Sequence, residues 1–321
     1  QWSSPKPQNG DWHIGRGVAI IMQKSGIPDI DQANCMIKLE SDGTFIVHSG
    51  GADIGTGLDT VVTKLAAEVL HCPPQDVHVI SGDTDHALFD KGAYASSGTC
   101  FSGNAARLAA ENLREKILFH GAQMLGEPVA DVQLATPGVV RGKKGEVSFG
   151  EIAHKGETGT GFGSLVGTGS YITPDFAFPY VAEVAVNTRT GEIRLDKFYA
   201  LLDCGTPVNP ELALGQIYGA TLRAIGHSMS EEIIYDAEGH PLTRDLRSYG
   251  APKIGDIPRD FRAVLVPSDD KVGPFGAKSI SEIGVNGAAP AIATAIHDAC
   301  GIWLREWHFT PEKILTALEK I

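Results

Sequence analysis

Residues 203–210 read Asp-Cys-Gly-Thr-Pro-Val-Asn-Pro, and their place between a hairpin and a helix decides the predicted fold. Upstream, the apolar segments 179–187 and 192–202 flank a turn at 188–191, which is the arrangement of a β-hairpin. Downstream, apolar residues between 214 and 225 recur at helical spacing. The stretch therefore predicts two antiparallel strands that lead through a polar bend into an amphipathic helix.

The same order of elements occurs earlier in the chain. Residues 34–40 and 44–48 form a second candidate hairpin, and the glycine-rich stretch 49–57 leads into a helical pattern over 58–69. A strand at 77–81 follows this helix. We therefore predict an α+β fold with two similar subdomains, each a mostly antiparallel sheet with helices packed against it.

The boundary between the two subdomains is predicted from composition. Gly, Thr and Ser dominate residues 155–170, which is typical of a connecting segment. This pattern predicts one subdomain over 1–165 and another over 166–321. A strand at 17–23 precedes the first hairpin, and a helix at 311–318, capped by Thr310, ends the pattern.

Composition excludes several classes of protein. The 321 residues hold 27 Lys plus Arg and 39 Asp plus Glu, a formal charge of −12 that repels phosphate polymers, so nucleic acid is not an expected partner. No run of 18 apolar residues and no signal peptide is present, which predicts a cytoplasmic protein without a membrane span. The five cysteines lack a Cys-x-x-Cys pair, and the eleven histidines lack a His-x-His or His-Glu-x-x-His arrangement, so no protein-ligated metal is expected.

Four loops rich in small residues each precede a helix, and all four carry Ser, Thr or Asn. They cover residues 49–57, 92–99, 203–210 and 276–284. Glycines allow backbone to approach a ligand, while helix N-termini and hydroxyls supply donors, so four such loops favour a phosphate-bearing cofactor. Each loop alone also fits a simple helix cap. None matches the P-loop or Gly-x-Gly-x-x-Gly patterns, which disfavours a nucleoside triphosphatase or a nicotinamide dehydrogenase.

Two charged residues in the last loop have both a chemical and a structural interpretation. Glu282 has mostly small or apolar neighbours in the sequence and could serve as a base near neutral pH, or it could only complement the dipole of the next helix. Lys278 could bind a phosphate or could be an ordinary solvated lysine. The residue types alone leave both choices open.

The motifs together resemble the molybdenum hydroxylases, the xanthine dehydrogenase family, over nearly the whole chain. The similarity covers the C-terminal half of the molybdopterin-binding region, and among family members it is greatest to the medium molybdopterin subunit of nicotinate dehydrogenase. The matching segments, in order, are Arg16-Gly17-Val18-Ala19, Gly55-Thr56-Gly57, Gly82-Asp83-Thr84-Asp85, residues 92–97, Asp203-Cys204-Gly205, Asn209-Pro210, residues 215–219 and residues 276–282.

The resemblance assigns a role to individual residues. Glu282 corresponds to the catalytic glutamate of the family. The cofactor-binding positions implied are Gly55, Thr56, Gly57, Ala95, Ser96, Ser97, Thr99, Gln216, Lys278, Ser279 and Ser281. The family usually has Gln where this chain has Thr56, so a hydrogen bond near the metal could be shortened, lost or replaced by water.

The resemblance also implies cofactors and partners. It implies molybdenum with molybdopterin cytosine dinucleotide and a terminal sulfido or selenido ligand, bound by both subdomains, with the catalytic glutamate in the second. The N-terminal half of the region is absent, so a second molybdopterin subunit is expected, with iron-sulfur clusters and FAD on separate partner subunits. The implied substrate is a small N-heterocycle.

The implied reaction inserts water-derived oxygen at a carbon beside a ring nitrogen, converting nicotinate to 6-hydroxynicotinate. The alternatives are an aldehyde hydroxylase subunit, a purine hydroxylase subunit of the xanthine type, and a scaffold paralogue without catalysis. Metal analysis and turnover assays distinguish these possibilities.

Overall fold

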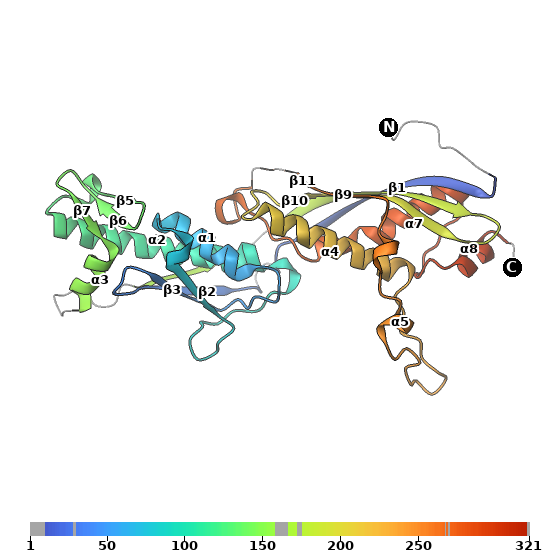
Figure 1. Ribbon diagram of the computed structural model, residues 1–321, viewed down its shortest axis with the longest axis horizontal. Coiled ribbons are helices and arrows are strands. Elements are labelled where there is room, and N and C mark those ends of the chain that lie inside the picture. The colour runs from blue at the N-terminus through green and yellow to red at the C-terminus, as the bar shows by residue number, and fades with distance from the viewer. Residues whose placement is uncertain are drawn as a thin grey trace.

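The computed structural model describes residues 10–27, 30–157, 166–171, 175–266, 268 and 270–319. Figure 1 shows two units side by side along the long axis of the molecule. Each unit has its own cluster of buried apolar residues, so the described residues form two hydrophobic cores. The structure is mixed α+β and six of its eight strand pairings are antiparallel, which confirms the predicted fold class.

The first unit is built on a four-stranded sheet of order β4-β3-β2-β8. β2 (Ala33–Leu39) and β3 (Phe45–Ser49) form the predicted hairpin, and β4 (Val77–Ser81) lies parallel to β3. The helices α1 (Leu58–Leu70) and α2 (Gly98–Leu125) pack against this sheet and each other. A helical crossover between β3 and β4 is required because parallel neighbours cannot be joined by a tight turn.

Smaller elements complete the first unit. At its far end a three-stranded sheet packs on α2 and α3 follows it (Figure 1). Three short 3₁₀ turns connect the larger elements. These elements are β5 (Gln133–Ala135), β6 (Val139–Arg141), β7 (Glu146–Ser148), α3 (Phe149–Glu157), η1 (Pro74–Asp76), η2 (Tyr94–Ser96) and η3 (Val129–Asp131).

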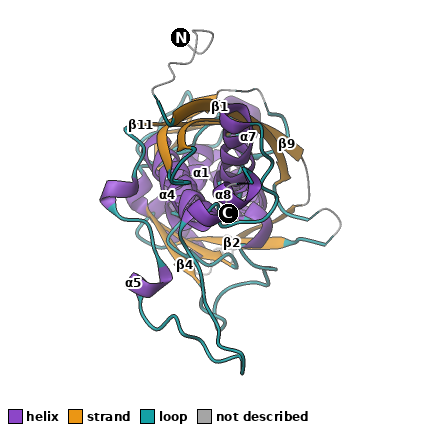
Figure 2. Cartoon of the chain, turned by 90° about the vertical axis from the view of Figure 1, so that its right-hand side faces the viewer, coloured by secondary structure: helices purple, strands orange, loops and turns teal. Residues whose placement is uncertain are grey.

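The second unit repeats the plan with a sheet of order β1-β9-β10-β11. The predicted hairpin is β9 with β10, and β11 lies parallel to β10 after a crossover through α4. Figure 2 shows these strands arching over the helices, with the segment that carries α5 extending away. The elements are β9 (Asp175–Asn187), β10 (Ile193–Asp203), β11 (Asp260–Val266), α4 (Pro210–Met229), α5 (Leu246–Tyr249), α6 (Ile283–Asn286), α7 (Ala288–Cys300), α8 (Pro311–Ala317), η4 (Ile254–Asp256) and η5 (Pro274–Gly276).

The two units exchange one strand each. β1 (Trp12–Lys24) precedes the first hairpin in sequence but pairs antiparallel with β9 of the second unit. Conversely, β8 (Val166–Tyr171) precedes β9 but pairs with β2 of the first unit. A division of the chain at 165 and 166 stays a prediction, and the strand pairing links residues on both sides of it.

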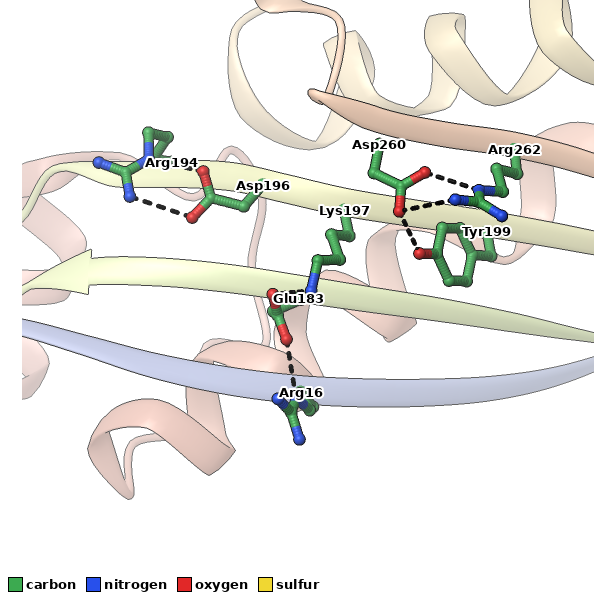
Figure 3. Close-up of polar contacts among 8 residues, drawn as sticks. All are labelled: Arg16, Glu183, Arg194, Asp196, Lys197, Tyr199, Asp260 and Arg262. Carbon is green, nitrogen blue, oxygen red and sulfur yellow. Dashed lines mark hydrogen bonds and ion pairs between the residues drawn. The ribbon is translucent and has the colours of Figure 1, made fainter. Parts of the chain in front are cut away.

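The open face of the β1-β9-β10-β11 sheet carries a row of paired charges, shown in Figure 3. Glu183 of β9 accepts from Arg16 of β1 at 2.8 Å and lies 2.9 Å from Lys197 of β10. Burial alone would raise the pKa of Glu183. The hydrogen bonds and positive charges of Lys197 and Arg16 outweigh this effect, so the pKa lies below its usual value. The remaining groups in the row are Arg194 with Asp196, and Arg262 and Tyr199 with Asp260. Each of the three carboxylates in this row has at least one cationic partner, and the four cations leave the row with a net charge of +1.

Gly17 lies where α7 crosses β1 at close range. A Cβ atom there would lie 2.1 Å from the carbonyl oxygen of Ala291. We expect Gly17→Val to lower the free energy of unfolding by about 1–3 kcal/mol or more, because α7 must move away from the sheet. Thermal unfolding measures this change. Gly219→Ala is the matched control, because a Cβ at Gly219 on α4 has no atom within 4 Å. Equal midpoints for both variants would contradict the close contact.

Among the helices of the described ranges, none combines the length and the apolar character that a membrane crossing requires.

Candidate functional site

The four small-residue loops meet between the two units. Two adjoining cavities of about 40 and 60 Å³ lie there, and Thr56, Val61, Thr99 and Ile280 line both. The first is also lined by Ile54, Leu58, Ala93, Ser96, Gly98, Ser279 and Ser281, and the second by Gly57, Cys204, Pro207, Val208, Asn209, Leu212, Ala213, Gln216, Ala277 and Lys278. Loops that are remote in sequence therefore line two adjoining cavities, which are together called the pocket below.

Three long helices begin at this pocket. α1 begins at Leu58, α2 at Gly98 and α4 at Pro210, and residues of each first turn line the cavities. Helix N-termini carry a partial positive charge, so three of them directed at one place favour an anionic ligand. One first-turn N–H of each helix is already paired within the chain, because Asp59 donates to Asp53, Cys100 to Ser279 and Leu212 to Asn209. At α4 the Asn209 side chain caps the helix by accepting from the Leu212 N–H at 3.2 Å.

Several polar side chains in the pocket are available for a ligand. Within the ranges that the structure describes, the side chains of Thr56, Thr99, Gln216 and Ser281 make no hydrogen bond to the chain. Three hydroxyls and one amide without partners are a donor set that suits the phosphate and pterin atoms of a molybdopterin. The residues present therefore fit the cofactor that the sequence predicts.

The glycine loop before α1 leaves space for a ligand, but the N–H groups of its two glycines are not free to bind one. Gly55 has φ +97° and Gly57 has φ +83°, conformations that favour glycine, and a Cβ at Gly55 would have open space around it. The N–H groups of Gly55 and Gly57 donate to Asp53 at 2.8 and 3.2 Å. Burial raises the pKa of Asp53, but these backbone donors outweigh it and leave the pKa below its usual value. A ligand can approach this backbone, whose N–H groups are already paired with Asp53.

The loop before α2 holds two residues in the left-handed region. Ala95 has φ 51° and Ser96 has φ 55°, which costs roughly 1–3 kcal/mol each for residues other than glycine. The Ala95 carbonyl accepts from the Gly26 N–H at 2.6 Å, and the Ser97 hydroxyl donates to the Gly92 carbonyl at 2.8 Å. Ala95 and Ser97 do not line either cavity, so among these predicted cofactor residues only Ser96 and Thr99 reach it.

Glu282 does not line either cavity, but its contact Ser96 and its chain neighbour Ser281 line the first, and one oxygen of its carboxylate is held by hydrogen bonds. Its Oε2 atom accepts hydrogen bonds from the Ser96 hydroxyl and from Gln23 Nε2, the latter at 3.1 Å. The Gln23 amide is in turn held by Asn286, whose Nδ2 donates to Gln23 Oε1 at 3.0 Å. Sequence reasoning missed Gln23 and Asn286, because nothing in the local pattern shows that β1 passes beside residue 282.

Lys278 lines the second cavity, and its ammonium group forms ion pairs. Nζ lies 2.8 Å from Asp203 Oδ2 and 3.7 Å from Asp270 Oδ2, and the lysine side chain is only 7% exposed. Burial raises the pKa of Asp203, but the hydrogen bonds from Lys278 and Ser268 leave it below its usual value. The geometry favours a structural role for this lysine, and binding of the cofactor by it stays a prediction.

Neighbouring contacts tie the last loop to the rest of the pocket. The Ser279 hydroxyl accepts from the Cys100 N–H at 2.9 Å, and the Lys278 N–H donates to the Cys204 carbonyl at 2.8 Å. In the described part of the chain, no group of three His, Cys, Asp or Glu side chains is placed to hold a metal ion.

Comparison with known proteins also indicates a molybdopterin-binding domain. The family model described as a molybdopterin cofactor-binding domain matches residues 2–258. Over 324 aligned residues the chain is 98% identical to the "Probable hypoxanthine oxidase XdhD" of Escherichia coli K12, covering 100% of this chain and 34% of that protein. It is 30% identical to the aldehyde oxidoreductase molybdenum-binding subunit PaoC of the same strain, covering 98% of this chain and 42% of that one.

A solved structure is similar over nearly the whole chain. Quinoline 2-oxidoreductase from Pseudomonas putida 86 matches with a TM-score of 0.87 and 26% identity, covering 97% of this chain and 42% of that one. The chain thus spans about a third to two fifths of the length of these relatives. With a family match over most of its length and a fold shared with molybdenum hydroxylases, the chain belongs to the molybdopterin cofactor-binding domain family within the xanthine dehydrogenase group.

Proposed function

We propose that this chain forms one wall of the cofactor pocket of a molybdenum hydroxylase and supplies its catalytic carboxylate. The observation that supports the proposal is the meeting of four remote loops, where unpaired hydroxyl and amide groups line two adjoining cavities and one of them, Ser281, immediately precedes Glu282. When bound, the molybdopterin group supplies the redox chemistry that the protein side chains lack. The side chains that would hold it are Thr56, Thr99, Gln216 and Ser281, with the backbone of Gly55 and Gly57 close by.

The cytosine dinucleotide form of the cofactor and a sulfido or selenido ligand belong to the same proposal. The helix N-termini of α1, α2 and α4 support a cofactor that carries phosphates, since each offers a positive end to the pocket. They do not distinguish one nucleotide from another. Nucleotide analysis of the cofactor released from the purified enzyme identifies it.

Glu282 is the proposed general base. A positioned carboxylate can accept a proton as an oxygen nucleophile attacks an electron-poor carbon beside a ring nitrogen, and such assistance contributes typically 10²–10⁴-fold to the rate. The chain holds Glu282 through Gln23 of β1 and through Ser96 of the loop before α2, and Ser96 lines the first cavity. Its role is therefore to place a proton acceptor next to the bound cofactor.

A further polypeptide region must complete the pocket. The two cavities are about 40 and 60 Å³, whereas ligand pockets are typically about 300–1,000 Å³, so the chain encloses only part of a pterin. A large apolar side chain at the first cavity, Ile54, remains 68% exposed. The relatives are longer than this chain, so the missing half can come from the same polypeptide or from a second molybdopterin subunit. We also propose that separate iron-sulfur and FAD subunits accept the electrons. The proposed location is the cytoplasm.

We infer a purine as the first substrate to test. A relative at 98% identity is named a probable hypoxanthine oxidase, which favours the purine alternative over nicotinate. An aldehyde is the second class, because PaoC is named an aldehyde oxidoreductase subunit. Purines and nicotinate both present a carbon next to a ring nitrogen, so the chemistry of Glu282 serves either.

The proposal predicts that the purified full-length enzyme contains about one molybdenum and one pterin for each copy of this chain. Turnover is expected to be highest with hypoxanthine when hypoxanthine, xanthine, nicotinate and an aldehyde are compared. Metal analysis by mass spectrometry and substrate-dependent dye reduction measure the two quantities. Absence of both molybdenum and pterin would favour a non-catalytic scaffold, and preference for an aldehyde or nicotinate would replace the purine.

A further inference from the structure

One oxygen of the Glu282 carboxylate is fully engaged and the other is not. Oε2 accepts from the Ser96 hydroxyl and from Gln23 Nε2. Among the described residues, none donates a hydrogen bond to Oε1. Glu282 is only partly buried. The two oxygens of one carboxylate therefore have different surroundings.

The hydroxyl of Ser96 has no capacity left for the cofactor. It donates to Glu282 Oε2 and accepts from Gln23 Nε2 at 2.9 Å and from the Glu282 N–H at 3.2 Å. One hydroxyl offers one donor and two acceptor sites, and all three are used. Ser96 is 4% exposed and held in the left-handed region at φ 55°, so its direction is fixed by the backbone.

Gln23 is oriented by a second amide. Asn286 Nδ2 donates to Gln23 Oε1 at 3.0 Å, so the NH₂ group of Gln23 is the end that faces Glu282 and Ser96. Without this contact, a rotation of the Gln23 amide could turn its carbonyl oxygen toward the carboxylate. Gln23 lies on β1 and residue 282 precedes α6, so the contact joins elements that are 259 residues apart.

From these contacts we propose that Gln23, Ser96 and Asn286 are positioning residues that hold Glu282 by Oε2 and leave Oε1 as the atom that receives the proton. The proposal rests on the assignment of Glu282 as the base, and it changes the predicted role of Ser96 from cofactor ligand to support of the glutamate. Fixing one oxygen matters because a misplacement of about 1 Å can cost on the order of a hundredfold in rate.

The first test uses Gln23→Met in the full-length enzyme, which keeps the side-chain length and removes the amide. We expect kcat to fall about tenfold or more, KM to change less than about threefold, and molybdenum and pterin content to stay at the wild-type level. Asn286→Ala should give a smaller fall in kcat in the same direction. Met22→Leu is the matched control, because Met22 is the adjacent residue on β1 and 72% exposed. An unchanged kcat in Gln23→Met would overturn the proposal.

The second test does not depend on activity. Gln23→Met, Glu282→Gln and the double variant form a cycle in thermal unfolding, and contact between the side chains predicts that the two shifts in midpoint are not additive. Additive shifts would overturn the contact itself. If the wild-type enzyme instead lacked cofactor and turnover while the cycle showed coupling, the proposed function would fail and the contact would stand.

Discussion

Replacing Glu282 with Gln is expected to lower the hydroxylation rate by about a hundredfold or more while the cofactor stays bound. The substitution keeps the size of the side chain and removes its ability to accept a proton, and the loss of a positioned base is typically 10²–10⁴-fold. A hundredfold loss corresponds to about 2.7 kcal/mol of transition-state stabilisation. Steady-state turnover, together with molybdenum and pterin content, measures the two parts of this expectation.

The control for Glu282→Gln is Glu211→Gln. Glu211 lies in the first turn of α4, is exposed, and does not line the pocket. The Glu211→Gln variant therefore also loses one negative charge, near the same group of helices. Wild-type turnover in Glu282→Gln would remove this residue from the mechanism. Loss of pterin from Glu282→Gln would instead assign it a role in binding.

Local patterns were sufficient to predict most elements of the fold. The two hairpins follow from apolar segments on either side of short turns, and the structure places them at β2-β3 and β9-β10. Thr310 caps α8 as predicted, by accepting from the Lys313 N–H at 3.4 Å. These features depend on residues that are neighbours in the sequence, so a single sequence contains the information.

Contacts between distant segments were the part that local patterns could not predict. The pairing of β1 with β9 and of β8 with β2 depends on which edge is open in the folded units, and no periodicity encodes that. For the same reason Gln23 was not predicted beside Glu282. The small residues of the loops predict a ligand site, but the use of the Gly55 and Gly57 N–H groups by Asp53 appears only in three dimensions.

The variant Lys278→Met tests whether this lysine has a structural or a ligand-binding role. If its role is structural, we expect the substitution to destabilise the whole fold. Removing the ammonium leaves Asp203 and Asp270 close together without their shared cation, and breaking a buried pair in this way costs about 3–5 kcal/mol. Because the Asp203 side chain is 21% exposed, we expect about 3 kcal/mol. Denaturant unfolding of the full-length enzyme measures the loss, and adding Asp203→Asn should recover part of it.

The same pair predicts a pH dependence. The pKa of Asp203 is lower in the folded than in the unfolded chain, where it is about 3.9. Its contribution to stability is therefore present above about pH 3.9 and is lost as the pH falls through the folded value. Lys278→Met should weaken this acid-side loss of stability. Lys143→Met is the matched control, since its pair with Asp131 is exposed and worth about 0–1 kcal/mol. Equal losses in the two variants, with cofactor missing only from Lys278→Met, would return Lys278 to the cofactor site.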